Sequence, residues 1–120
     1  MRKYLLLMLI IMFFSISSNA TSTLIFAGDD YEVQVVVSDT TPEQIVTVNF
    51  GGPDQTGLIS IMPGDFAKLS IDCEKQKLIL VFNNPGDSKL PPSFKLRAIK
   101  DRAYIKIGGS KIKLKGDWIR

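Results

Sequence analysis

The sequence contains no histidine among its 120 residues. Histidine is the commonest general base in enzymes, the usual activator of serine and cysteine nucleophiles, and the commonest metal ligand. Its absence excludes Ser-His-Asp and Cys-His sites. A pair of carboxylic acids of the glycosidase kind stays formally open, but it needs a substrate cleft, which a chain of this size rarely builds. We therefore expect a protein that is not an enzyme and that has no catalytic residue, metal site or cofactor.

Cysteine is also scarce, since Cys73 is the only one and cannot form an internal disulfide. In an alternating pattern it continues the face of Ala67, Leu69 and Ile71. This position predicts a small buried hydrophobic residue. An intermolecular disulfide is the alternative.

The acidic segment "GDDYE" precedes the first long strand and contains Asp29, Asp30 and Glu32. Carboxylates are ligands for calcium, but the segment lacks the residue order of a calcium-binding loop. We expect a solvated turn here.

Residues 1–20 have the three parts of a secretory signal peptide: two basic residues, an apolar run from Tyr4 to Phe14, and small polar residues. Small residues before position 21 predict cleavage after Ala20, which leaves a domain of residues 21–120. The apolar run is shorter than the ~20 residues that span a bilayer. An uncleaved N-terminal anchor is the alternative. The protein is thus expected to be exported, to the periplasm or outside the cell.

Charge is divided unevenly along the chain. Residues 21–74 hold nine acidic residues and one base, a net charge of −8, whereas residues 75–120 hold twelve bases and three acids, a net charge of +9. Two arrangements explain this division. The halves form an acidic and a basic face, or strands from the two halves lie side by side and neutralise one another.

Alternation with a period of two recurs along the chain and predicts strands. In "YEVQVVVS" the apolar residues Tyr31, Val33, Val35 and Val37 share one face, as in a half-buried strand. No segment outside residues 1–20 shows helical spacing beyond one turn. Seven to nine short strands in one domain indicate an all-β fold, and we favour a small antiparallel β-sandwich of immunoglobulin-like kind, with a small barrel as the alternative. The expected strands begin at Tyr31, Gln44, Gly57, Phe66, Lys77, Ser93, Arg102 and Ser110, with short edge strands at Thr23–Ala27 and Asp117–Arg120.

Two segments, "MPGD" from Met62 and "NPGD" from Asn84, set proline before glycine. Proline fixes the first central dihedral of a type II turn, and glycine accepts the positive φ of the second. Both segments therefore predict type II turns.

The segment "IKIGGSKIKLKG" contains Gly108 and Gly109 between two alternating runs. Both central residues of a tight hairpin turn need positive φ, which glycine adopts freely. The turn predicts a hairpin register from Ile107 opposite Ser110 to Arg102 opposite Lys115. The face expected in the core consists of Ala103, Ile105, Ile107, Ile112 and Leu114. The opposite face, named the basic face here, consists of Arg102, Tyr104, Lys106, Lys111, Lys113 and Lys115.

The basic face has two alternative explanations. It binds an anionic ligand, with Lys95 and Arg97 as extensions if their strand is adjacent, or it is a solvated face that resists aggregation. Repulsion does not decide between them, because two ammonium groups ~6 Å apart in water repel by under ~1 kcal/mol. For an exported protein, the expected partner is an acidic protein, an anionic glycan or a lipid, and export argues against nucleic acid.

Trp118 stands near the end of the chain. Its ring is expected to cap the core while its N–H finds water or a carbonyl. The alternative is a tail that pairs with another subunit's sheet. The sequence thus predicts an exported binding protein. An inhibitor is one form that such a binding protein takes. An envelope or appendage component that assembles by edge-strand pairing is the alternative.

Overall fold

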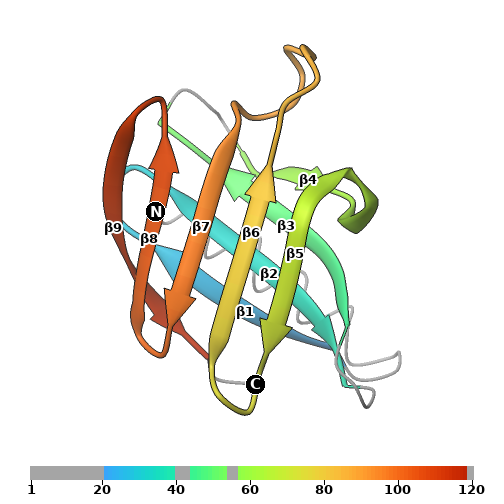
Figure 1. Ribbon diagram of the computed structural model, residues 1–120, viewed down its shortest axis with the longest axis vertical. Helices are drawn as coiled ribbons and strands as arrows, with labels where there is room; N and C mark the ends of the chain where they lie inside the picture. Colours follow the sequence, from blue (N-terminus) through green and yellow to red (C-terminus); the bar gives the residue numbers. More distant parts are fainter. Residues whose placement is uncertain (1–20, 40–43, 54–56, 119–120) are drawn as a thin grey trace.

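The computed structural model describes residues 21–39, 44–53 and 57–118, and the signal peptide expected in residues 1–20 lies outside them (Figure 1). The described residues form nine strands and one short 3₁₀ helix, and none of them forms a helix long and apolar enough to cross a membrane. The elements are β1 (Thr21–Ala27), β2 (Glu32–Ser38), β3 (Ile45–Gly51), β4 (Ile59–Ile61), η1 (Pro63–Asp65), β5 (Phe66–Asp72), β6 (Lys77–Phe82), β7 (Phe94–Ile99), β8 (Arg102–Ile107) and β9 (Ser110–Asp117).

All nine strands belong to one antiparallel sheet with the order β4-β3-β2-β1-β9-β8-β7-β6-β5. Two runs of consecutive strands, β1–β4 and β5–β9, are therefore joined where β1 pairs with β9, from Ile25 opposite Asp117 to Ala27 opposite Lys115. The expectation that Thr23–Ala27 is an edge strand was wrong. β1 is an interior strand, because β2 pairs along one side of it and β9 along the other.

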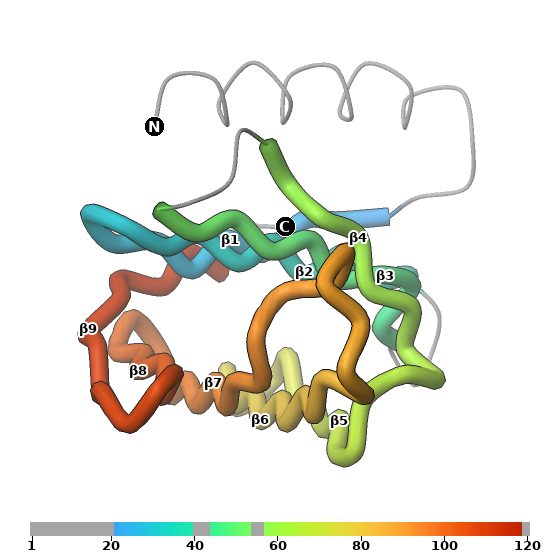
Figure 2. Tube along the Cα trace, turned by 90° about the horizontal axis from the view of Figure 1, so that it is seen from above, coloured from blue at the N-terminus to red at the C-terminus, as the bar shows by residue number. Residues whose placement is uncertain are grey.

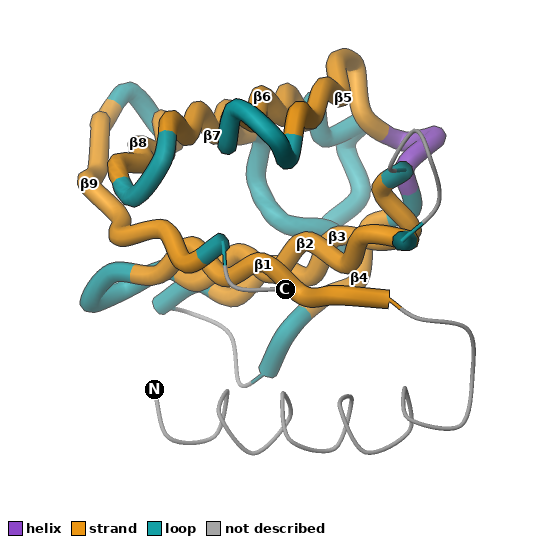
Figure 3. Tube along the Cα trace, turned by 90° about the horizontal axis from the view of Figure 1, so that it is seen from below, coloured by secondary structure: helices purple, strands orange, loops and turns teal. Residues whose placement is uncertain are grey.

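The sheet curls into a half-barrel with two facing layers (Figure 2). β1–β4 form one layer, β5–β8 form the other, and β9 passes from one layer to the other at one side. On the opposite side, the chain passes from β4 through η1 to β5, and these two strands do not pair with each other (Figure 3). The all-β prediction is confirmed. The favoured sandwich of two separate sheets is not confirmed, because β9 makes the two layers one sheet, and the barrel alternative fits.

The curl at β9 depends on a close approach of the chain to an aromatic ring. A Cβ atom on Gly116 would lie 2.9 Å from two ring carbons of Phe26 and 3.1 Å from the carbonyl oxygen of Lys100. The backbone N–H of Gly116 donates a hydrogen bond to the carbonyl of Asp101 at 2.9 Å. Glycine therefore allows β9 to reach β1 while it stays attached to the β7–β8 turn.

Trp118 closes the same end of the barrel, as its capping role predicted. Its side chain is buried and packs edge-on against Phe26, with ring centroids 5.5 Å apart. The indole N–H donates to the carbonyl of Lys100. A buried Trp118 is thus part of the core of its own chain.

Aromatic rings fill the barrel near the end that carries η1. Phe50 of β3 stacks on Phe94 of β7 across the two layers, with centroids 5.0 Å apart. Phe66 and Phe82 pack edge-on to each other and both contact Phe94. Cys73 belongs to the same buried cluster, which confirms its predicted role as a small core residue.

β2 differs from its prediction as a half-buried strand. Val33, Val35 and Val37 face the core, but Gln34 and Val36 on the other face are buried as well. Both faces of this strand are therefore removed from solvent.

Of the two predicted type II turns, one is wrong. Gly86 has φ = 101°, in agreement with the prediction for "NPGD". In "MPGD" the φ of Gly64 is not positive, and the chain forms η1 instead, with the N–H of Asp65 donating to the carbonyl of Met62 at 3.0 Å. Proline at the first helical position is as favourable for a helical turn as for a type II turn. The dipeptide alone therefore does not separate the two.

Candidate functional site: a basic face of the sheet

The β8–β9 hairpin has the register that Gly108 and Gly109 predicted. These glycines have φ values of 57° and 82°, and Ile107 lies opposite Ser110. The pairing continues without a bulge to Arg102 opposite Lys115. Ala103, Ile105 and the other apolar residues of the hairpin face the core, so the basic face points outward.

β7 lies beside β8, so Lys95 and Arg97 join the basic face as the sequence analysis allowed. Together they form the extended basic face, which is the six residues of the basic face with Lys95 and Arg97 added. The register sets its residues in three rows across β7, β8 and β9. The rows are Lys95–Lys106–Lys111, Arg97–Tyr104–Lys113 and Ile99–Arg102–Lys115.

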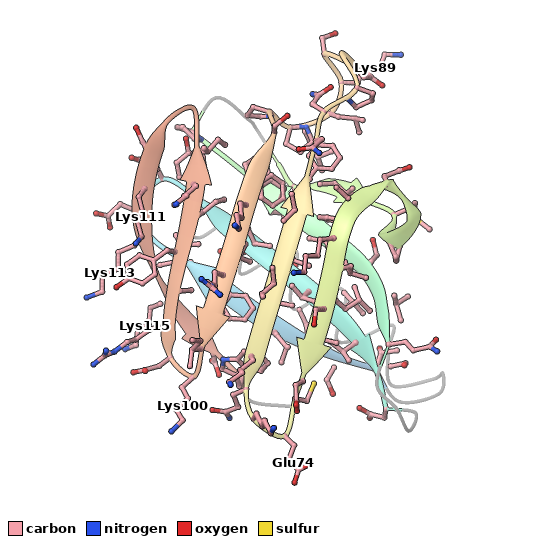
Figure 4. The ribbon with its side chains drawn as sticks, viewed as in Figure 1. Glu74, Lys89, Lys100, Lys111, Lys113 and Lys115 are labelled. Atoms are coloured by element: carbon pink, nitrogen blue, oxygen red, sulfur yellow. The ribbon has the colours of Figure 1, made fainter. Side chains whose placement is uncertain are left out.

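Figure 4 shows how the side chains of this face project. Lys111, Lys113 and Lys115 point away from the barrel along β9, at the side where the sheet curls. Lys106 and Arg102 on β8 are exposed as well. The positive charge therefore covers the outer face of β7 and β8 and continues around the corner strand.

The structure answers the question of whether acidic strands cover these bases. β1–β4 form the opposite layer, and the one acid within these strands is the buried Glu32. In the paired residues of the described sheet, one acid of the first half lies opposite a base of the second, Asp72 opposite Lys77 on β5 and β6. No acidic residue occurs in the three rows. Neutralisation between strands thus acts at the far side of the layer and leaves the extended basic face positive.

Tyr104 lies at the centre of the extended basic face, and 37% of its surface is exposed. The Nζ of Lys111 lies 4.5 Å from the centroid of its ring, within the range of a cation–π contact. The ring offers a flat apolar surface among charges. Such a surface stacks against sugar rings or planar groups.

A hollow of about 620 Å³ opens beside Tyr104, toward the β7–β8 turn. Its volume is within the usual range for small-molecule sites. The side chain of Ile99, 49% exposed, gives it an apolar wall, and Asp101 supplies one acceptor among the donors. Its lining consists of Arg97, Ile99, Lys100, Asp101, Arg102, Tyr104 and Lys111. A second hollow, of about 100 Å³, lies on the other side of Tyr104, next to Lys95 and Lys106.

The sequence analysis missed three residues of the larger hollow, Ile99, Lys100 and Asp101. The sequence contained a signal for them, since only two residues separate the strands that became β7 and β8. In the structure this connection is a tight turn, in which Lys100 has φ = 56°. A tight turn there implies that β7 and β8 are neighbours. That inference places the end of β7 beside Arg102.

The other residues considered from the sequence do not form a site. Asp29 and Asp30 are exposed, and the described residues contain no group of three side chains able to hold a metal ion. Glu32 is buried and accepts a hydrogen bond from Gln34 Nε2 at 2.8 Å. Burial raises the pKa of Glu32, and the Gln34 hydrogen bond opposes that rise. The residues paired with Glu32 on both sides, Ala27 and Gly51, bring no positive charge.

Comparison of the chain with models of known protein families, with curated proteins and with solved structures finds no match.

Proposed function

We propose that this chain is an exported binding protein without catalytic activity and that the extended basic face holds an anionic ligand. The observation that carries the proposal is the arrangement of seven bases around Tyr104 in three adjacent rows, with no acid among them. Like charges opposite one another on a sheet disfavour folding slightly. A ligand that supplies negative charge removes this cost, and a basic patch of this size attracts such ligands over several ångströms.

The face suits a ligand that has both charge and flat apolar surface. Arg97 and Arg102 offer planar donor groups, which pair with carboxylate, sulfate or phosphate in two parallel hydrogen bonds. Tyr104 stands between them and offers its ring. A sulfated or uronate-containing glycan combines both features. An acidic protein segment and a phosphate-bearing lipid headgroup supply the charge, and an exported protein meets all three.

The test is reversal of charge at Lys106, Lys111 and Lys113 by substitution with glutamate. Binding is measured at low and high salt to a sulfated polysaccharide, to polyglutamate, to anionic phospholipid vesicles and to single-stranded DNA. We expect binding to at least one of the first three, with an affinity that falls as salt rises and falls roughly 100-fold in the triple variant at low salt. We do not expect binding to DNA, because export argues against nucleic acid as the partner.

A matched control separates this site from general attraction. Lys75 and Lys89 are exposed in loops away from the hairpin. The double variant Lys75→Glu/Lys89→Glu changes net charge as much as Lys106→Glu/Lys111→Glu does. If both double variants weaken binding equally, or if the wild type binds none of the probes at low salt, the proposal is wrong.

A second candidate function is assembly through an unpaired sheet edge. The observation that favours it is the position of β5, a seven-residue strand at the end of the sheet order. Unpaired N–H and C=O groups along such an edge are able to accept a further strand.

A further inference from the structure

β5 is the longer of the two edges of the sheet. β4, at the other end, has three residues, whereas β5 has seven and pairs with β6 on one side only. In Figure 1, β5 is the right-hand strand of the front layer. Proteins usually shorten or cover an edge of this length, because it is a template for pairing with another chain.

The space beside this edge is open. A hollow of about 490 Å³ lies between β5 and the start of β3, lined by Gln44 and Ile45 on one side and by Leu69, Ser70 and Ile71 on the other. Leu69 and Ile71 face the core, but they are only partly buried. Two apolar side chains at the mouth of the barrel thus lack cover that one more strand would supply.

The sequence of β5 is complementary to itself when it is reversed. In an antiparallel pair of two copies centred on Ser70, Lys68 lies opposite Asp72 of the second copy, and Leu69 lies opposite Ile71. The β5–β6 register places Lys68 and Asp72 on the outer face, because their partners Val81 and Lys77 continue into the outer rows of the sheet. Each pairing across the two-fold axis therefore joins side chains on the same face.

The three kinds of pair in this register are all favourable ones. Opposite charges, apolar residues and two serines directly across antiparallel strands each contribute roughly 0.2–1 kcal/mol relative to alanine pairs. Lysine on an edge strand normally discourages pairing, but in this register it meets a carboxylate twice, once on each side of the axis. The shift in the β5–β6 register between Phe66 and Lys68 lies outside the paired segment.

We propose that β5 is a homodimer interface, in which two copies of the chain pair antiparallel about Ser70. A two-fold axis makes the contact closed, so it yields a dimer and not a filament. The β5–β8 layers of the two copies then form one continuous sheet. Leu69 and Ile71 of each copy enter the open space beside Ile45 of the other. This inference rests on β5 and not on the extended basic face, which lies on β7–β9.

The first test is a charge exchange across the axis, with the mass of the full chain measured by sedimentation or light scattering over a range of concentrations. Lys68→Glu places two carboxylates opposite each other at both ends of the interface, and we expect the dimer dissociation constant to rise roughly tenfold. Asp72→Lys has the converse effect. A mixture of the two single variants restores opposite charges at both ends and should form a heterodimer as tight as the wild-type dimer.

The controls separate dimer loss from misfolding. Asp72 Oδ1 accepts a hydrogen bond from the N–H of Lys75 at 3.0 Å, so Asp72→Lys also alters the β5–β6 turn. Lys68 lies opposite Val81 and has no such role in the register. Lys68→Glu therefore carries the argument, with thermal unfolding to confirm that the variant is folded. Lys89→Glu makes the same change of charge in the β6–β7 loop, and it should leave the dimer unchanged.

A single cysteine tests the register directly. In a Cys73→Ala background, Ser70→Cys should give a disulfide-linked dimer on mild oxidation, because only a residue on the axis faces its own copy at a Cβ distance that a disulfide spans. Ser88→Cys, in an exposed loop, should not. The proposal fails if the wild type is a monomer at concentrations of several hundred micromolar, if Lys68→Glu leaves the dimer unchanged, or if Ser70→Cys does not cross-link. Loss of ligand binding by the triple variant of the basic face with an intact dimer leaves this inference standing, so the two proposals are tested separately.

Discussion

Lys111 and Tyr104 lie diagonally across the β8–β9 hairpin, with the ammonium nitrogen 4.5 Å from the ring centroid. The residue directly opposite Lys111 is Lys106, another base. The position of Lys111 over the ring sets its charge against the negative face of the aromatic system. Tyr104 thus orients a lysine whose cross-strand partner is another base.

This relationship predicts that the ring of Tyr104 matters more than its hydroxyl. Tyr104→Leu removes the aromatic face, and we expect binding of the anionic probe to weaken roughly 5- to 30-fold, the effect of a lost stacking or cation–π contact of about 1–2 kcal/mol. Tyr104→Phe keeps the ring and should bind within about twofold of the wild type. Titration of each variant with the probe at low salt gives both values.

Equal losses in Tyr104→Leu and Tyr104→Phe would point to the hydroxyl instead of the ring. An unchanged affinity in both would remove Tyr104 from the site.

The buried Glu32 predicts a pH dependence of stability. Burial raises the pKa of Glu32 above its ordinary value of 4.5, so folding favours the protonated form. This contribution to stability is fully present below pH 4.5 and is lost as the pH rises through the folded-state pKa. Glu32→Gln stays neutral at every pH. The free energy of unfolding of Glu32→Gln should therefore gain on that of the wild type as the pH rises from 4 to 7.

Gln34 provides a second test, because it changes the pKa of Glu32 in the opposite direction to burial. Its hydrogen bond to Glu32 stabilises the carboxylate and lowers the pKa. Gln34→Leu removes that donor, so the pH at which the stability is lost should move upward. Denaturant unfolding between pH 4 and pH 8 measures all three proteins. Parallel pH profiles for the wild type and Glu32→Gln would show that the burial of Glu32 has no electrostatic consequence.

Gly116 predicts a steric requirement at the corner of the sheet. A Cβ atom there would meet two carbons of the Phe26 ring at 2.9 Å, and Phe26 is fully buried, so a ring within the core must shift. We expect Gly116→Ala to lower the free energy of unfolding by roughly 1–3 kcal/mol, the usual cost of overpacking a core. Chemical denaturation provides the value.

Gly64→Ala is the matched control, because nothing lies within 4 Å of a Cβ atom at that position and its φ is not positive. Its effect should stay within about 0.5 kcal/mol. Adding Phe26→Leu to Gly116→Ala should recover part of the lost stability if the clash is the cause. A Gly116→Ala variant as stable as the control would mean that the corner adapts without strain.

The parts of the structure that the sequence predicts well are those fixed by residues close together in the chain. The hairpin register follows from Gly108 and Gly109, because a two-residue turn leaves a single alignment of the flanking strands. The burial of Cys73 follows in the same way from its position in an alternating run. The orientation of the basic face therefore needed no information from distant parts of the chain.

The pairing of β1 with β9 was not predictable in this way. Ile25 and Asp117 are far apart in sequence, and the alternation within each strand is satisfied by many partners. For this reason Thr23–Ala27 was expected at an edge of the sheet, and a sandwich of two separate sheets was favoured over a barrel. The hollow beside Tyr104 is a different case, because the two-residue connection between β7 and β8 indicates that these strands are neighbours.

Because β1 pairs with β9, the sheet cannot be complete until β9 has been synthesised. During synthesis, strands β1–β4 emerge first and pair only with their sequence neighbours, as β5–β9 do later. The two groups become one sheet only when the final strand meets the first. Until β5–β8 have been synthesised, the inner face of β1 and β2, with Leu24, Phe26 and Val35, has no opposite layer. A nascent chain of this protein thus exposes an apolar surface while the strands of the second layer are still being made, and chaperones that hold unfolded chains have that interval in which to engage it.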